Sequence, residues 1–531
     1  MKIKAIAAAV VVLLGTAGCT DLLVEPKSAV SGAKSFEDPA AYRAFLAKLY
    51  AGLSLTGQQG PAGSGDIQGI DEGFSSYLRQ YWQMQELPTD EAIIGWGDAG
   101  LPELNSQLWS SSNQFFAAMY SRIFFQVAMA NEFLRETTDE KLAARGQTAD
   151  ALIAEVRQFR AEARFLRALS YWHGLDLFGN IPLVTEDFPL GTTPPEQRTR
   201  AEIFTFIEQE LNEIEADLPA PGAGEYGRAD QGALLMLRAK LYMNAGVYVG
   251  QDRYADALAA VDALIRSGAY MLDDDYQHIF LADNHTSPEI IFALPADGEH
   301  AQTFGGMTYL THAPVGGSMN PADYGVDFGW GGPRARPEVV ALFEAGPDGL
   351  PTSGPDARGH LFYTDGHTLT IQNVSDFTNG YAYVKYRNVT STGEPGSRLN
   401  FPDTDFPMFR LADAYLMYAE AVLRGGGGSR AQALAYVNAL RERAYGDTSG
   451  NITDAELDLD LILAERAREL MWEAHRRSDL IRYGLFTGGE YVWSWKGGVE
   501  AGTATADHLA LYPIPETELL LNPGLEQNPG Y

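Results

Sequence analysis

Residues 155–184 read EVRQFRAEARFLRALSYWHGLDLFGNIPLV and form the longest strongly periodic stretch of this 531-residue chain. Apolar side chains recur at steps of three and four residues, the spacing of one helix face: Val156, Phe159, Ala163 and Leu166. After Phe165 the apolar positions spread around the helix, which is typical of a helix passing from a surface into a core. Gly179 stands where a C-terminal cap is expected, and Pro182 follows where a helix cannot resume. The stretch therefore predicts a long scaffold helix on which other helices pack.

A second face of the same stretch carries arginines at helical spacing: Arg157, Arg160, Arg164 and Arg167. The chain has 70 acidic and 39 basic residues and a net charge of −31, so each arginine has acidic neighbours to pair with. We interpret the stripe as structural ion-pair formers rather than as a site for an anionic ligand. The negative charge also opposes binding to nucleic acid by electrostatics alone. With 45% hydrophobic and 21% charged residues, the chain is predicted to be globular.

The N-terminus has the pattern of a targeting segment. Two lysines are followed by an apolar run too short to span a bilayer and then by small residues directly before Cys19, the only cysteine. This arrangement resembles the lipobox of bacterial lipoproteins, although Thr16 stands where leucine is usual. We predict a signal peptide over residues 1–18, lipidation of Cys19 and a tether over residues 19–35. The alternative is an ordinary signal peptide with an incidental cysteine.

Helical periodicity recurs along most of the chain. Besides the helix that begins near residue 148, helices are predicted over residues 39–53, 113–136, 199–218, 230–245, 253–267, 409–423, 429–444 and 459–483. Two pairs of these, 230–245 with 253–267 and 409–423 with 429–444, share small and aromatic residues at fixed offsets. They are consistent with tetratricopeptide-like repeats, and generic helical hairpins are the alternative. Residues 270–402 are rich in Gly, Pro, Asp and Asn and are predicted to form loops with a few short strands.

Sequence motifs of catalysis and cofactor binding are absent. The chain contains no HExxH zinc motif, phosphate loop, EF-hand loop or GxSxG nucleophile motif. The nine histidines have no metal-ligand spacing, so no metal or cofactor is predicted. A glycosidase needs only two carboxylates, and the 70 acidic residues leave that possibility open.

Aromatic residues in polar, breaker-rich segments are the distinctive feature. Trp96 lies in TDEAIIGWGD and Trp330 in DYGVDFGWGGPR, neither on a helical core face. Exposed aromatic rings offer an apolar platform for the C–H face of a sugar, and nearby amides and carboxylates can bind its hydroxyls. Alternatively the two tryptophans anchor loops onto the core, a reading that the glycines beside Trp330 favour.

Six blocks of sequence, in this order, resemble the SusD/RagB family of nutrient-uptake outer-membrane lipoproteins. They are CTDLLVEP at 19–26, EARFLRALSYWHGLDLFGNIPLV at 162–184, GRADQGALLMLRAKLYM at 227–243, FRLADAYLMYAEAVLR at 409–424, LAERARELMWEAHRRSDLIRYG at 463–484, and LYPIP with QNPGY at the end. The resemblance covers almost the whole chain after the signal peptide. It implies a mainly α fold, with a tetratricopeptide-like helical scaffold and a loop-rich region that carries short strands.

The resemblance also implies an organisation and a function. Residues 36–230 would form an N-terminal SusD-like region, and residues 231–531 a C-terminal region with the helix pairs and the loop-rich insertion 270–402. The protein would bind oligosaccharide at the outer membrane, facing the exterior, and deliver it to a SusC-like TonB-dependent transporter, without being an enzyme. The expected ligand-binding residues are Trp96, Trp330, Trp82, Tyr81, Tyr309 and Tyr324. The alternatives are a peptide-capturing lipoprotein of the same type and a secreted glycosidase lipoprotein.

Overall fold

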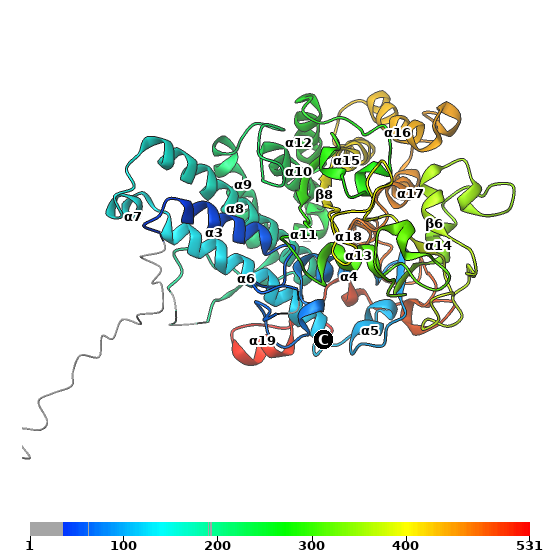
Figure 1. The fold of residues 1–531 in the computed structure, drawn as a ribbon, viewed down its shortest axis with the longest axis horizontal. Helices are drawn as coiled ribbons and strands as arrows, with labels where there is room; N and C mark the ends of the chain where they lie inside the picture. Colours follow the sequence, from blue (N-terminus) through cyan, green and yellow to red (C-terminus); the bar gives the residue numbers. More distant parts are fainter. Residues whose placement is uncertain (1–35, 62, 190, 192–193) are drawn as a thin grey trace, which may run out of the picture.

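Helix α8 (Asp150–Phe178) is the axis around which the N-terminal helices pack (Figure 1). This computed structural model describes residues 36–61, 63–189, 191 and 194–531, so the predicted signal peptide, Cys19 and the tether lie outside it. Every residue of α8 from Phe165 to Phe178 is buried, and Gly179 ends the helix with a φ of 76°. Helices α3 (Ala40–Ala51), α6 (Gln114–Glu136) and α9 (Arg200–Ile214) pack against it. The predicted scaffold helix and its C-terminal cap are confirmed.

Two of the four arginines on α8 form the predicted ion pairs. Arg164 pairs with Glu210 at 2.6 Å and also with Glu213, both on α9. Arg167 is almost fully buried and pairs with Glu210 at 2.6 Å. Arg160 instead donates to backbone and hydroxyl oxygens, and Arg157 is exposed at the surface. The stripe therefore holds α8 to α9 mainly through its last two arginines.

The predicted helix pairs form one continuous array. Helices α10 (Gln231–Met243), α12 (Tyr254–Arg266), α15 (Leu411–Leu423) and α16 (Arg430–Tyr445) pack each on the next in chain order, as Figure 1 shows at the top of the molecule. The helix predicted from residue 409 starts at Leu411 because Phe409 and Arg410 belong to strand β8. Helix α17 (Leu459–Leu470) packs on α15 and extends the array.

The strands that the structure describes are short and form two-stranded antiparallel sheets. Strand β4 (Ile290–Leu294) pairs with β8 (Phe406–Arg410), β2 (Ile181–Pro182) with β3 (Gln197–Arg198), and β6 (Phe362–Tyr363) with β7 (Ala382–Tyr383). Strand β1 (Ala92–Ile94) pairs with β5 (Pro333–Ala335), with Ile93 opposite Arg334. This last pairing brings the segment after residue 94 beside the segment before residue 333, so the two tryptophan loops meet.

The helix predicted over residues 459–483 is wrong as a single element. The chain leaves helical geometry after α17, with Trp472 at a φ of 65° and Ala474 at a φ of 63°, and resumes as α18 (Arg476–Arg482). The side chains of Glu91 and Glu86, both buried, hold this turn. The backbone N–H of Trp472 donates to the Glu91 carboxyl group at 3.0 Å, and the backbone N–H of His475 donates to that of Glu86 at 3.1 Å. No Gly or Pro marks the break, so the sequence pattern runs through it.

Helix α4 (Tyr77–Glu86) was not predicted, because it lies in a breaker-rich, mixed segment and half of its residues are polar, yet all ten are buried. It packs between α6, α18 and α13 (Gly306–His312) and forms the floor beneath the tryptophan loops. Among the described residues, no helix has both the length and the apolar character that crossing a bilayer requires.

Candidate functional site

The two tryptophan loops and the start of α4 enclose a pocket of about 630 Å³. Its lining combines aromatic, acidic and basic side chains: Gly63, Asp71, Glu72, Gly73, Phe74, Arg79, Trp96, Asp98, Phe304 and Trp330. Its size falls in the range of pockets that hold small ligands. The mixture of apolar faces and polar groups suits a ligand that has both.

Trp96 and Trp330 are half-buried neighbours in this pocket. Their ring centroids lie 6.4 Å apart with the ring planes tilted by 40°, and the Trp96 Nε1–H donates to the Trp330 carbonyl at 3.3 Å. Trp96 packs edge-on against Tyr309, and Trp330 packs on His312 with ring centroids 5.2 Å apart. Each ring is held by the core and still lines the pocket, so each one is both an anchor and a platform.

The backbone around Trp330 is tied down residue by residue. The backbone N–H of Trp330 donates to the His312 carbonyl at 3.0 Å. The next two backbone N–H groups, of Gly331 and Gly332, donate to the carbonyls of Val315 at 2.8 Å and Ala313 at 2.7 Å. A Cβ at Gly332 would lie 2.7 Å from Cζ2 of Trp96, so only glycine leaves room for that ring. The glycines beside Trp330 therefore serve the tight packing that the sequence indicated.

Arg79, on α4, is the pocket residue that sequence reasoning missed. Its side chain is 3% exposed, and its guanidinium lies 4.1 Å from the Phe74 ring centroid and 4.3 Å from that of Tyr309. Nη1 donates to the Gly73 carbonyl at 2.9 Å, while Nε and Nη2 have no hydrogen-bond partner among the described residues. Burial lowers the pKa of Arg79 to about 10, so the group stays charged at neutral pH. The sequence offered one signal for it: Arg79 is the only basic residue in the aromatic segment that contains Tyr81 and Trp82.

Buried donors without partners are uncommon in folded proteins. Arg79 lines the pocket, and its unpartnered N–H groups are buried directly behind that surface. Carboxylates of Asp71, Glu72 and Asp98 also line the pocket and offer acceptors for hydroxyl groups. Burial, followed by the charge of Asp71, raises the pKa of Glu72 to about 7.

The other expected ligand residues lie deeper. Tyr309 is fully buried and supports both Trp96 and Arg79 from beneath. Trp82 is fully buried, and its Nε1–H donates to the Trp472 carbonyl at 2.9 Å. Tyr81 stacks on His173 with ring centroids 4.0 Å apart, outside the pocket lining.

Tyr324 belongs to a separate apolar cluster and is 8% exposed. The structure thus brings together Trp96 and Trp330 at the pocket surface, with Tyr309 behind them. It does not bring Trp82, Tyr81 or Tyr324 to that surface. Aromatic residues in breaker-rich sequence look alike whether they are buried or exposed, because the pattern carries no burial signal.

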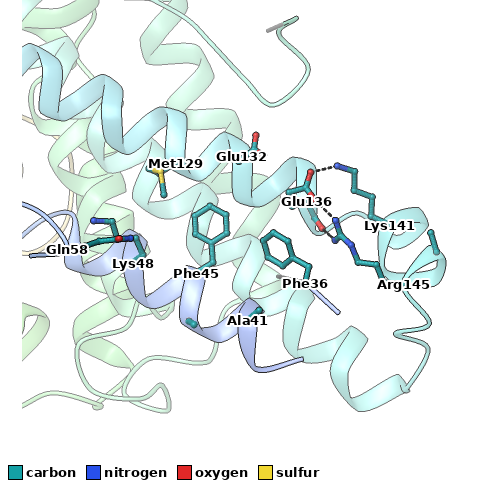
Figure 2. Close-up of a pocket in the computed structure, with 12 residues that line it drawn as sticks. Phe36, Ala41, Phe45, Lys48, Gln58, Met129, Glu132, Glu136, Lys141 and Arg145 are labelled. Carbon is teal, nitrogen blue, oxygen red and sulfur yellow. Dashed lines mark hydrogen bonds and ion pairs between the residues drawn. The ribbon is translucent and has the colours of Figure 1, made fainter. Parts of the chain in front are cut away.

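A larger groove, of about 840 Å³, lies between α3, α6 and α7 (Asp139–Ala144) (Figure 2). Its walls are mainly apolar, with Phe36, Phe45 and Met129 among them. The charged groups at its edge already pair with one another, since both Lys141 and Arg145 bind Glu136. None of the described residues that line this groove has a buried donor without a partner, so we do not regard it as the ligand site.

No group of three or more His, Cys, Asp and Glu side chains within the described residues is arranged to hold a metal ion.

Comparison with known proteins gives consistent relatives. A family model described as the SusD family matches residues 358–531. The chain is 37% identical to the starch-binding protein SusD of Bacteroides thetaiotaomicron, over 97% of this chain and 96% of that protein. It is 27% identical to the SusD-like protein P25 of Formosa agariphila, over 71% of this chain and 73% of the relative.

Solved structures agree with the fold. A SusD superfamily protein from Parabacteroides distasonis superposes with a TM-score of 0.71 at 21% identity, covering 93% of this chain and 99% of that one. The surface glycan-binding protein A from Bacteroides thetaiotaomicron, in complex with laminarihexaose, gives 0.69 at 21% identity, covering 92% and 99%. The expected mainly α architecture is confirmed. Because a 37% identical relative is matched over nearly the whole of both chains, this chain belongs to the SusD family.

Proposed function

We propose that this protein captures oligosaccharides in the pocket of Trp96 and Trp330 for nutrient uptake. The observation that carries the proposal is the pairing of two half-buried tryptophans with Arg79, whose buried N–H groups lack partners within the described chain. A sugar ring has an apolar C–H face and a rim of hydroxyls, so it matches this combination. The tryptophan rings would bind the C–H faces, and Arg79 would donate to adjacent hydroxyl oxygens.

Among sugars, we propose a neutral glucan as the ligand. The relative that is 37% identical is named a starch-binding protein, which makes an α-glucan the first ligand to test. The structural neighbour that holds laminarihexaose makes a β-glucan the second. The carboxylates of Asp71 and Asp98 beside one arginine disfavour an acidic polysaccharide by like-charge repulsion.

We further propose that the protein is anchored through a lipidated Cys19 to the outer membrane, facing the exterior. There it would pass its ligand to a SusC-like TonB-dependent transporter, and it would act without catalysis and without a cofactor. Membership of the SusD family and the lipobox-like segment support this arrangement. Co-purification of such a transporter with the full-length protein tests the partner, and loss of membrane association in Cys19→Ala tests the anchor.

The central test is Trp96→Ala in a soluble form that starts after Cys19. Loss of one stacking surface is expected to weaken binding of maltoheptaose about tenfold or more, while the circular dichroism spectrum stays unchanged. Calorimetric titration measures the affinity. Trp495→Ala is the matched control, because Trp495 is half-buried and lies outside the pocket.

Equal affinity of the wild type and Trp96→Ala would remove Trp96 from the site. A screen that finds peptide binding and no glycan binding would replace the oligosaccharide by a peptide. New reducing ends after incubation with the bound glycan would reveal a glycosidase instead.

A further inference from the structure

Exposed apolar side chains gather at one edge of the tryptophan pocket. Phe304, Leu399 and Phe328 are 37%, 44% and 60% exposed. Phe304 lines the pocket itself and packs on the buried Phe401, with ring centroids 5.3 Å apart. Leu399 and Phe328 lie outside the pocket lining, and we call these two residues the shelf.

The shelf is joined to Trp330 by short, hydrogen-bonded backbone. Phe328 precedes Trp330 by two residues, a distance of at most about 7 Å along the chain. The Asp327 N–H donates to the Leu399 carbonyl at 3.1 Å, which ties the two shelf segments together. The shelf residues therefore lie close to Trp330, on the segments beside the pocket.

One buried residue supports both the shelf and Trp330. His312 is 1% exposed, its ring packs beneath Trp330, and its Nε2 lies 3.1 Å from the Leu399 carbonyl. The intervening Gly329 faces inward, since a Cβ there would lie 2.3 Å from the Val315 carbonyl oxygen. The exposure of Phe328 thus comes from a segment that is fastened on both sides, and not from a loose loop.

Arg79 lines the inner side of the pocket and the buried Tyr309 packs behind it, so a polymer longer than the pocket must continue outward. The edge beyond Trp330 offers apolar surface for the next sugar units, in line with the stacking that we propose inside. Asp323 and Asp327 are exposed beside Phe328. The cation next to Leu399, Arg398, is paired with Glu299 at 3.3 Å, so the charge near the shelf is net acidic. A negatively charged lipid surface is therefore a poor occupant, whereas a neutral glycan suits it.

We propose that Phe328 and Leu399 form an outer subsite that binds glycan units extending from the pocket past Trp330, so that affinity rises with chain length. This inference rests on the proposed oligosaccharide function. It predicts that the pocket decides whether a glycan binds and that the shelf decides how strongly a long one is preferred over a short one.

The test compares maltotriose and maltoheptaose on the wild type and on Phe328→Ala by calorimetric titration. The wild type is expected to bind maltoheptaose more tightly. Phe328→Ala is expected to weaken maltoheptaose binding about three- to tenfold and to leave maltotriose binding unchanged, because only the longer chain reaches the shelf. Leu399→Ala should act in the same direction. Met271→Ala is the matched control, since Met271 is 64% exposed and does not line the pocket.

The outcomes separate the two proposals. A wild type that binds neither sugar would overturn the glucan function, and the shelf with it. Binding by the wild type with the same affinity for both lengths, or an unchanged length preference in Phe328→Ala, would overturn the shelf alone. An equal loss for both sugars would make Phe328 part of the pocket rather than an outer subsite.

Discussion

At the scale of single residues, the pocket depends on how its aromatic rings are held. Trp96 lies against Gly332 so closely that an added Cβ would meet Cζ2 at 2.7 Å and Cε2 at 2.8 Å. The indole is large and rigid, so it must tilt or shift to make room for even one methyl group. The position of the Trp96 ring is therefore set by the absence of a side chain at Gly332, directly before β5.

Gly332→Ala is therefore expected to weaken maltoheptaose binding about three- to tenfold and to cost about 1–3 kcal/mol of stability, because the indole must move. Gly97→Ala is the matched control, because a Cβ at Gly97 would meet nothing within 4 Å. Titration gives the affinity, and thermal unfolding monitors stability. If Gly332→Ala binds as tightly as Gly97→Ala, the position of Trp96 does not govern binding.

At the scale of elements, buried carboxylates shape the turn between α17 and α18. Glu91 and Glu86 accept the N–H groups of Trp472 and His475. Burial, only partly offset by the charge of Arg476, raises the pKa of Glu91 to about 7. Burial and the neighbouring Glu91 raise the pKa of Glu86 well above its usual range. The folded protein is therefore most stable when these two carboxyl groups carry protons.

A carboxyl whose pKa rises on folding contributes stability at low pH and loses it as pH rises through the folded pKa. For Glu91 this loss falls between its ordinary value of 4.5 and about 7. Glu91→Gln keeps an acceptor for the Trp472 N–H but does not titrate. Its stability relative to the wild type is expected to rise between about pH 5 and about pH 8, by at most about 3 kcal/mol.

Urea unfolding across this pH range measures the difference. Glu500→Gln, at an exposed position, is the control and should show no such trend. A difference between Glu91→Gln and the wild type that stays constant with pH would mean that Glu91 is ionised throughout.

At the scale of the whole molecule, a buried ion network joins distant parts of the chain. Glu469 of α17 accepts from Arg410 at the end of β8 at 2.7 Å and from Arg358 in the loop-rich region at 2.9 Å. It also pairs with Arg443 of α16. Burial alone would raise the pKa of Glu469, but the charges of Arg443, Arg410 and Arg358 outweigh it and hold the pKa well below its usual range. The helical array and the loop-rich region are thus coupled through one carboxylate.

Glu469→Gln is expected to destabilise the protein by about 3–5 kcal/mol near neutral pH, because it leaves buried arginines without their counter-charge. Since the pKa is depressed on folding, the stability from this carboxylate is present above its ordinary pKa of 4.5 and is lost as pH falls below it. The difference in unfolding free energy between the variant and the wild type should therefore become smaller in acid.

Chemical unfolding measures this difference. Asp454→Asn, which breaks an exposed pair with Arg430, is the control and should have little effect. A small effect of Glu469→Gln at neutral pH would contradict the coupling.

The sequence by itself determined the helical scaffold and the family. Helix α8, its Gly179 cap and the helix pairs follow from periodicity and end signals, which act between residues a few positions apart. Trp96 and Trp330 could be singled out because they lie between glycines, in segments that have no helical periodicity and so predict no buried helix face. These features are local, so a linear pattern carries them.

Only the tertiary structure decided which residues meet. The pairing of β1 with β5 sets Trp96 beside Trp330, the fully buried α4 brings Arg79 under them, and Glu91 breaks a helix whose own sequence has no breaker. Each of these depends on contacts between segments far apart in the chain. Burial and hydrogen bonds between such distant segments outweigh local secondary-structure preference, and they produce no periodic pattern in the sequence. The sequence could therefore indicate two of the pocket residues, but not which other residues would join them.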